Sequence, residues 1–526
     1  MKKIRLQKIL LTIFLISIIN SGLVAQVKEG DTVKFWSVAY IDWYPTSPPY
    51  PPAQYQITAV CRKVGASCYL FFDTTYNHNI EQNYLDYVAN SFDSFTYPTF
   101  TSLYGAIPIG IDGDPKVYIL VGSGDSMWAG YFDPIQGMPD TMTSRLWKRH
   151  SSQKEIIYVG NYYWYWAENI AHEFGHLLHW GQDHSPEPPE HPVKYWEEGW
   201  VDEGFSTFAE YSFWDTMSLP DRMYYYKSAP GDYSLIWFES YDPSRLIFSY
   251  MYEHFGGDLF LKTLISEQAN GFEGFRKTLK KLGYSETFDE IFENIVLACY
   301  ADDRFFENGK YGFYHYNFQS LPVLFRTLRL HSFFPVNNQS GTVRPYSAKY
   351  VNFSSTSPKP LSIEFNGDDT LKFRLSFLLY KDKQLIEVRK VSLDSQNNAW
   401  FGADSFGTAY NHITMAVINV DSTLGFSETG KFTYSASAYK TGIHNQTQDF
   451  ISIYPNPASN YVVVKADLNP AFNNSLEVID QFGKSMLLKV INSNETRIDI
   501  STLPPAMYFI KINNGDHLYV RELMKY

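Results

Sequence analysis

The spacing of hydrophobic residues divides the chain into stretches of different structure. Up to about residue 160 short apolar runs dominate, and those at 114–122 and 155–160 predict buried strands. Apolar residues spaced by three and four between Leu85 and Phe95 predict one amphipathic helix among these strands. The first part of the chain is therefore predicted to be mainly β-structure.

A helical spacing takes over from Ala167 to about Ala301. Apolar positions recur there with a period near 3.6 residues and predict helices at 167–180, 197–213, 243–254, 257–268, 271–282 and 286–300. Strands followed by a run of helices are typical of an α+β domain, which we place at residues 26–334.

After residue 335 the pattern changes to short strands separated by turns of Gly, Asn and Ser. It predicts a β-sandwich over 335–447, in which residues 441–449 form a polar linker. Residues 448–526 predict a further small β-domain with hairpin turns. The sequence thus indicates an α+β domain followed by two all-β, sandwich-like domains.

The first 25 residues are expected to lie outside the fold. Four basic residues precede an apolar run from Ile9 to Ile19, and small residues lead to Ala25, which is typical of a cleaved signal peptide over 1–25. The run is shorter than the about 20 residues that a membrane span needs, and no second stretch reaches that length. We therefore expect an exported chain with no transmembrane segment in its mature form.

Charge and cysteine content narrow the functional classes. A formal net charge of −12 argues against nucleic acid as a partner, because phosphate binding needs a basic face. Three cysteines are too few for a disulfide scaffold or a cluster of cysteine ligands. Cys61 and Cys68 flank a predicted turn, so export would permit a bridge between them across the hairpin, whereas Cys299 is expected to be a buried free thiol.

The motif that carries chemistry is H-E-x-x-H, formed by His172, Glu173 and His176. On a helix the two histidines lie on one face, one turn apart, so both rings can reach one tetrahedral Zn²⁺. Glu173 lies beside the first ligand, where it can take a proton from water. The alternative is a core helix with hydrogen-bonded polar residues, and the burial cost of two His and a Glu disfavours it.

Zinc needs a third protein ligand, and Glu203 on the next predicted helix is the best candidate. The metzincin pattern fails, because its Gly and final His positions are His179 and Gln182 here. Glu210, two turns after Glu203, could instead accept a hydrogen bond from a ligand His. The remaining rivals for the third position are His179, Asp183, His184, Glu197, Glu198, Asp202 and Glu210.

The segments IAHEFGHLLHW and WVDEGFSTFAEY together resemble the gluzincin zinc metallopeptidases, most of all their hyicolysin-like branch. The resemblance covers about residues 30–300. It implies a zincin-like catalytic domain in which His172, His176 and Glu203 bind zinc and Glu173 is the general base. Asp202 stands where related aminopeptidases have Asn, a departure beside the third ligand.

Two further assignments concern residues outside these motifs. Tyr241 falls where the family places a tyrosine that stabilises the transition state, and the alternative in a chain with 41 Tyr is a packing role. Asp112 and Asp114 offer hard carboxylates for Ca²⁺, and the alternative is a plain Asp-Gly turn before a strand.

The tail of the chain resembles the type A C-terminal sorting domain of type IX secretion over about 450–526. The matching features are Y-P-N-P at 454–457, G-K at 483–484 and I-S-x-L-P from Ile500. The resemblance implies passage across the outer membrane, with the secretion machinery as a partner. The alternative is a carbohydrate-binding or structural β-domain, for which no aromatic platform is recognisable in the sequence.

Together these features predict a secreted or cell-surface zinc endopeptidase that hydrolyses extracellular proteins through a metal-activated water. One alternative is a surface adhesin or glycan-binding protein with a relic zincin domain, which the intact motifs disfavour. Another is an aminopeptidase, which needs a group that captures the substrate's N-terminus. The sequence contains no segment like G-x-M-E-N for that task, so an endopeptidase is preferred.

Overall fold

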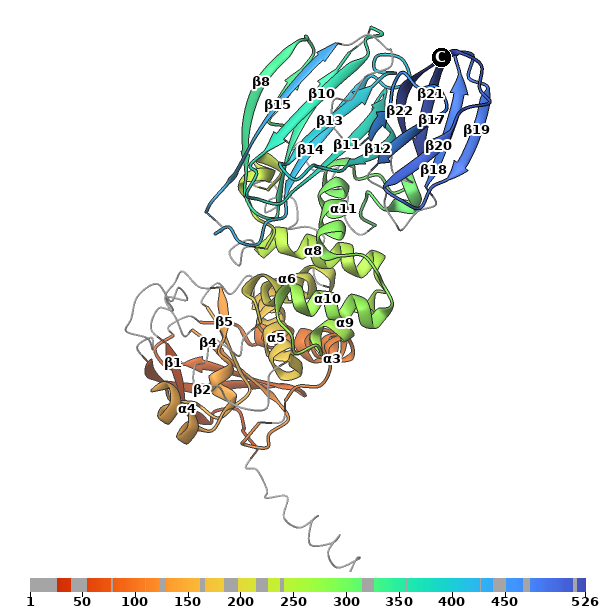
Figure 1. Ribbon diagram of the computed structural model, residues 1–526. Helices are drawn as coiled ribbons and strands as arrows, with labels where there is room; N and C mark the ends of the chain where they lie inside the picture. The colour runs from red at the N-terminus through yellow and green to blue at the C-terminus, as the bar shows by residue number, and fades with distance from the viewer. Residues whose placement is uncertain are drawn as a thin grey trace, which may run out of the picture. The chain divides into compact units, whose positions relative to one another are not determined.

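The computed structural model of the chain divides into two compact units, Met1–Ala438 and Tyr439–Tyr526 (Figure 1). The predicted signal peptide and the predicted linker at 441–449 lie outside the residues that it describes. Those residues are 26–38, 54–76, 79–108, 110–122, 129–160, 166–183, 197–213, 226–236, 241–314, 326–355, 357–425, 427–438, 451–466, 474–513 and 518–526.

The first unit begins with a mixed sheet in the order β1-β2-β3-β4-β6-β5. Its strands are β1 (Thr32–Val38), β2 (Gln54–Val64), β3 (Cys68–Asp73), β4 (Val117–Val121), β5 (Gly130–Phe132) and β6 (Ile156–Val159). The three central strands β3, β4 and β6 run parallel, while β5 pairs antiparallel with β6 at the edge of the sheet. The buried strands predicted at 114–122 and 155–160 are confirmed as β4 and β6.

The first predicted helix is interrupted. α2 (Gln82–Ser91) continues into a π-helical turn at Phe92–Thr96 and then into α3 (Tyr97–Tyr104). Leu85, Val88 and Phe92 are buried as expected, but Phe95 is 37% exposed. The i→i+5 bonding of the π-turn shifts the residues that follow off the apolar stripe, which explains this departure from the pattern.

Six described helices confirm the helical stretch expected after Ala167. They are α5 (Trp166–Asp183), α6 (Gly199–Phe213), α8 (Tyr241–His254), α9 (Asp258–Ile265), α10 (Gly271–Leu282) and α11 (Phe288–Ala301). A short helix that the pattern did not predict, α4 (Asp140–Trp147), precedes them. Thr287 and Glu290 form a capping box at the start of α11, which satisfies backbone donors that the helix leaves open there.

Aromatic contacts seat α5 against the sheet and the helices before it. The ring of Trp166 lies 5.6 Å from that of Phe72 on β3, and Phe174 packs edge-on against Phe92 at 5.0 Å. On its other side α5 approaches α6 so closely that a Cβ at Gly175 would lie 3.1 Å from Ser206. Glycine at this position therefore permits the close crossing of the two helices that carry the H-E-x-x-H motif and Glu203.

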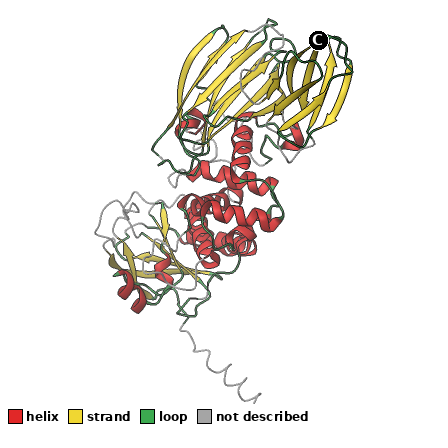
Figure 2. Ribbon diagram, in the orientation of Figure 1, coloured by secondary structure: helices red, strands yellow, loops and turns green. Residues whose placement is uncertain are grey.

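The second half of this unit is a β-sandwich, as predicted (Figure 2). One sheet has the order β13-β10-β15-β8 and the other β12-β11-β14-β9-β7. The strands are β7 (Arg329–His331), β8 (Val336–Val343), β9 (Ser347–Ser354), β10 (Leu361–Gly367), β11 (Phe373–Lys381), β12 (Gln384–Val391), β13 (Asn398–Ala403), β14 (His412–Asn419) and β15 (Gly430–Ala438). The Tyr350 hydroxyl donates to the Val296 carbonyl at 2.7 Å, so α11 packs directly on the sandwich.

The second unit is also a pair of antiparallel sheets, in the orders β16-β17-β20 and β19-β18-β21-β22. Its strands are β16 (Ile451–Tyr454), β17 (Tyr461–Ala466), β18 (Ser475–Asp480), β19 (Ser485–Val490), β20 (Glu495–Asp499), β21 (Ala506–Asn513) and β22 (Leu518–Lys525). Alternate residues such as Val462, Val464 and Val478 form its core. The predicted small β-domain is confirmed as a fold of this kind.

The bridge considered between Cys61 and Cys68 is wrong. Both are free thiols, and they belong to different hydrophobic clusters, Cys61 with Phe71 and Cys68 with Leu70 and Phe72. Successive side chains of a strand point to opposite faces, so the two sulfur atoms lie on opposite sides of the sheet and cannot bond. Cys299 is buried and free, as predicted.

Candidate metal centre

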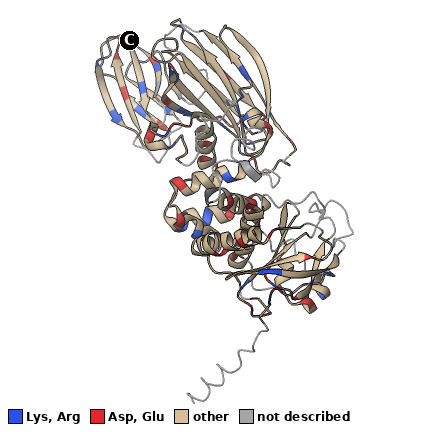
Figure 3. Cartoon of the chain, turned by 180° about the vertical axis from the view of Figure 1, so that it is seen from behind, with Lys and Arg blue, Asp and Glu red and all other residues tan. Residues whose placement is uncertain are grey.

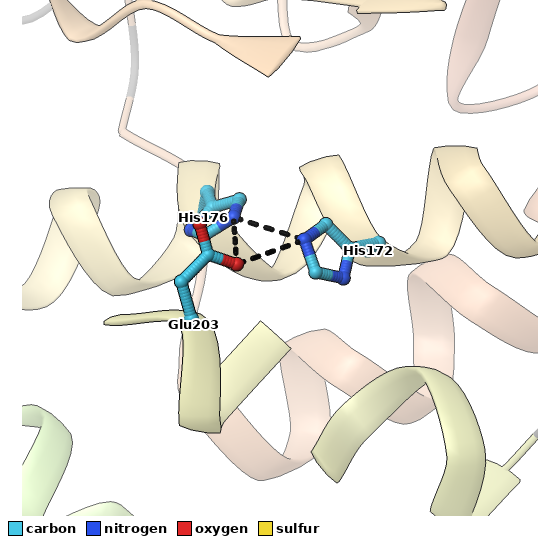
Figure 4. Close-up of side chains that lie close together, drawn as sticks. All are labelled: His172, His176 and Glu203. Carbon is cyan, nitrogen blue, oxygen red and sulfur yellow. Dashed lines mark hydrogen bonds and ion pairs between the residues drawn. The ribbon is translucent and has the colours of Figure 1, made fainter. Parts of the chain in front are cut away.

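The helices α5 and α6 bring three potential metal ligands together (Figure 4). His172 and His176 lie one turn apart on the face of α5 that α6 covers, and their Nε2 atoms are 3.2 Å apart. Glu203, in the second turn of α6, places its Oε2 atom 3.3 Å from Nε2 of His172 and 3.6 Å from Nε2 of His176. One nitrogen from each ring and one carboxylate oxygen thus form a compact triangle.

The triangle has the size that one zinc ion requires. With Zn–N and Zn–O distances near 2.1 Å, tetrahedral ligand atoms lie about 3.4 Å apart. The three observed separations lie close to this value. Within the described residues, Glu203 Oε2 is buried and has no partner in hydrogen-bond geometry, although it faces both rings. An unsatisfied acceptor between two imidazole nitrogens is the environment that a bound cation would complete, so these residues fit Zn²⁺.

Two carboxylates hold the histidine rings from behind. The Nδ1–H of His172 donates to Glu210 Oε2 at 3.2 Å, which leaves Nε2 directed toward Glu203. Asp202 Oδ2 lies 2.9 Å from Nδ1 of His176. Carboxylates behind ligand histidines fix the tautomer and ring orientation and raise the basicity of the ligand nitrogen.

Glu173 is buried next to this triangle. Its residue exposure is 5%, and its side chain lies under the edge strand β5, where a Cβ at Gly130 would meet Cγ and Oε1 of Glu173 at 2.9 Å. Burial raises the pKa of Glu173 to about 7. A carboxylate with this pKa beside an edge strand is able to accept and return a proton near neutral pH.

The ligands themselves are held in a strongly coupled network. Burial lowers the pKa of His172, but the neighbouring carboxylates of Glu203 and Glu210 outweigh it and raise that pKa to about 10. Burial opposes the same effect at His176, where Asp202 and Glu203 raise the pKa well above its usual value. The pKa of Glu203 is lowered, because the attraction of the two histidines exceeds the cost of burial.

A second group of potential ligands lies further along the same helices. Nitrogen and oxygen atoms of His179, Asp183 and Glu197 all lie within 4.8 Å of one another. His179 Nδ1 donates to Asp202 Oδ1 at 2.7 Å, so Asp202 joins this group to His176. Burial raises the pKa values of Asp183 and Glu197 to about 7 each.

The other predicted site residues fall in three classes. Glu198 accepts a hydrogen bond from the Trp200 indole and is in neither group. His184 and the side chain of Tyr241 lie outside the described residues, although Tyr241 begins α8. The calcium candidates are paired with protein donors: Lys154 contacts Asp112 at 2.9 Å, and the Tyr69 hydroxyl donates to Asp114. These contacts favour the alternative of a turn before β4.

Asp202 and Gly130 make contacts at the site that the sequence does not predict. Asp202 was considered as a rival ligand, yet it bridges two histidines of α5. The available signal is the three-residue spacing of His176 and His179, which makes the two rings neighbours on the surface of the helix. No signal in the sequence indicates that Gly130 covers Glu173, because this contact depends on the crossing of β5 and α5.

Comparison with known proteins identifies the type of domain at the end of the chain. Residues 452–526 match the family described as "Secretion system C-terminal sorting domain". This is the sorting domain of type IX secretion, so the protein is secreted or displayed at the cell surface, and the secretion machinery is a partner. Among the described helices, none combines the length and apolarity that a membrane crossing requires. No curated protein matches the sequence significantly.

Three solved structures each resemble a part of the chain. PorZ, a surface component of the type IX secretion system of Porphyromonas gingivalis, is 13% identical over 18% of this chain and 14% of its own, with a TM-score of 0.13. The pre-peptidase C-terminal domain of a Bacillus anthracis collagenase is 12% identical over 21% of this chain and 98% of its own, with a TM-score of 0.17. A Faecalibacterium prausnitzii β-glucuronidase is 12% identical over 36% of this chain and 38% of its own, with a TM-score of 0.14.

Proposed function

We propose that the chain is a secreted zinc-dependent endopeptidase with a zincin-like catalytic domain of the gluzincin type. His172, His176 and Glu203 would bind the metal, and Glu173 would be the general base. The observation that carries the proposal is the triangle of ligand atoms from α5 and α6, whose edges suit one tetrahedral ion. A buried Glu173 beside it supplies the second element that hydrolysis requires.

Zinc, when bound, would polarise the scissile carbonyl and lower the pKa of water from 15.7 to about 7. Glu173 then takes the proton of the attacking water on its carboxylate and returns it to the leaving amine. Its burial against Gly130 supports this role, because a carboxyl group with a pKa of about 7 can serve as base and then as acid near neutral pH.

The supporting residues have separate tasks in this proposal. Glu210 holds His172 through a hydrogen bond from Nδ1, and Asp202 lies in ion-pair contact with Nδ1 of His176, so that both rings keep Nε2 directed at the ion. The edge strand β5 offers backbone groups along which an extended peptide could lie beside Glu173. Tyr241 stays a hypothesis as a donor to the developing oxyanion, and its position at the start of α8 permits a test by substitution.

The sorting tail completes the proposal. We assign residues 450–526 to the type A class, in which the domain directs passage across the outer membrane and is then removed or used for surface attachment. Substrates would accordingly be extracellular proteins or peptides.

The experiment that tests the function is a cleavage profile on denatured proteins, measured with and without a chelator. Cleavage at internal bonds that the chelator abolishes and added zinc restores supports an endopeptidase. Release of single N-terminal residues would instead identify an aminopeptidase. Two results together would favour the adhesin with a relic domain. The purified protein would cleave no substrate, and its metal content would be the same as that of the double variant His172→Ala, His176→Ala.

A further inference from the structure

The group of His179, Asp183 and Glu197 lies where the end of α5 meets the start of α6. His179 and Asp183 are one turn apart on α5, and Glu197 precedes α6 by two residues. Their ligand atoms lie within 4.8 Å of one another, and the side chains of His179 and Asp183 are only 3% and 7% exposed. One imidazole and two carboxylates therefore converge at buried or half-buried positions of the helical layer.

Asp183 provides independent support for a ligand site at this group. Within the part of the chain that the structure describes, its Oδ1 atom is buried and has no hydrogen-bond partner, and its Oδ2 atom is 3.9 Å from Nε2 of His179. That distance is too long for a hydrogen bond. A carboxylate that is more than nine-tenths buried normally has its oxygens satisfied, so an unpartnered one beside an imidazole and a second carboxylate marks a position that a bound cation would complete.

A hydrogen bond from Nδ1 of His179 selects the tautomer in which Nε2 can bind a metal. Nδ1–H donates to Asp202 at 2.7 Å, so a neutral ring presents the lone pair of Nε2 toward Asp183. Glu197 accepts from the Gly271 backbone N–H with Oε1 at 2.7 Å. This contact fixes the carboxylate while leaving Oε2 for a further partner. Both are the arrangements that orient ligands in known metal sites.

We propose that His179, Asp183 and Glu197 form a second binding site for a divalent transition-metal ion of the Zn²⁺ class. One nitrogen and two oxygen donors suit such an ion better than Ca²⁺, which prefers oxygen ligands alone. The ion ties the C-terminal end of α5 to the segment before α6 and, through Glu197, to the first residue of α10. Its role is structural, and Asp202 couples it to the first site by contacting His176 and His179.

The test is the zinc content of the full-length protein after dialysis against zinc and then against metal-free buffer. We expect two ions per chain in the wild type and one in each of two conservative variants, Asp183→Asn and Glu197→Gln. Glutamine at 197 keeps an acceptor for Gly271, which preserves the local fold. The exposed Glu273→Gln serves as the matched control and should keep both ions, because its partner is Arg276 at the surface.

The failure of this site and of the proposed peptidase site are distinguishable. The double variant His172→Ala, His176→Ala removes the first site and should retain one ion, which Asp183→Asn then abolishes. Circular dichroism on each variant establishes that it is folded. If Asp183→Asn and Glu197→Gln hold as much zinc as the wild type, or if the double histidine variant of a two-ion wild type holds none, the second site does not exist.

Discussion

Two side-chain clusters in the first unit differ in the charged partners that they give to a carboxylate. At the contact of α11 with the sandwich, Glu293 is 1% exposed and is paired with Arg374 at 2.8 Å and Lys390 at 3.2 Å. Between α5 and α6, the side chain of Glu203 is 15% exposed, and its ion pairs within the described residues are with His172 and His176 alone. Figure 3 marks the acidic residues of this helical layer in red.

The difference separates a structural cluster from a binding site. Lys and Arg keep their charge across the physiological pH range, so the Glu293 cluster is complete by itself. A metal ion can displace the protons of histidine, because a neutral imidazole is a metal ligand, whereas Lys and Arg keep theirs. The α5–α6 cluster is therefore the one that can exchange protons for a cation, and the predictions below act on this contrast.

The largest effect is expected from Glu173→Gln. The substitution keeps the shape of the side chain and removes its basicity, so peptide cleavage should fall a hundredfold to ten-thousandfold, or about 3 to 5 kcal/mol. Turnover of a protein substrate, measured with the zinc content of the same sample, checks the prediction. Near-normal cleavage by a zinc-loaded variant would eliminate the proposed role of Glu173.

Removal of metal should destabilise the protein through the α5–α6 cluster and not through the Glu293 cluster. A ligand present at a thousandfold excess over its Kd stabilises the folded state by about 4 kcal/mol, so a chelator should lower the unfolding temperature of the wild type markedly. In the double variant His172→Ala, His176→Ala that shift should shrink, because the first site is lost. An equal chelator effect in both proteins would show that His172 and His176 hold no stabilising ion.

Glu293→Ala should destabilise the protein by a different route. It leaves Arg374 and Lys390, each about one-third exposed, without their partner and removes an acceptor of the Ser376 hydroxyl. We expect a loss of about 2 to 3 kcal/mol in the free energy of unfolding, independent of chelator. Denaturant unfolding with and without chelator measures it. A loss that depends on metal would contradict the division between the two clusters.

Residues that follow a regular period were predictable, and those that depend on packing were not. The facing of His172 and His176 follows from helical geometry, and Glu203 was placed by its position on a second amphipathic helix. The connection of Asp202 to both His176 and His179 follows from how closely α5 and α6 cross, which Gly175 and Ser206 determine together. No local pattern encodes that approach.

The same reasoning explains the errors in the β-structure. Cys61 and Cys68 are close in sequence and flank a turn, which made a bridge plausible. The bulge between Cys61 and Lys63 and the alternation along β3 decide which face each sulfur takes. Register of this kind is a property of the assembled sheet, so a sequence pattern that locates the hairpin does not determine it.

A third buried carboxylate sharpens the comparison by its pH dependence. Burial, with the nearby Asp112 as a smaller cause, raises the pKa of Glu155 to about 7 from 4.5. Because the folded pKa is raised, the charged form destabilises the fold: the penalty is absent below pH 4.5, grows up to about pH 7 and is constant above. Glu155→Gln should therefore be more stabilising at pH 8 than at pH 5. The change in the free energy of unfolding on substitution should be larger at pH 8 by about 1 to 2 kcal/mol.

Denaturant unfolding of wild type and Glu155→Gln at the two pH values, both with chelator present, gives the measurement. The exposed Glu273→Gln is the matched control and should show no such difference. If Glu155→Gln has the same effect at pH 5 and pH 8, the carboxylate is not held with a raised pKa and another charge must compensate it.

The smallest effect is expected from removing the tail. Tyr439–Tyr526 forms a compact unit with its own hydrophobic core, and the residues of both metal groups lie before residue 211. A chain that ends near His444 should therefore keep its zinc content and cleave protein at the wild-type rate in vitro, while secretion is lost because the sorting domain is absent. Cleavage rate, zinc content and the fraction of protein exported are measured on the same pair of chains. A folded, zinc-loaded truncation that no longer cleaves would mean that the tail contributes to substrate binding, and the contrast between a self-contained site and a dispensable tail would fail.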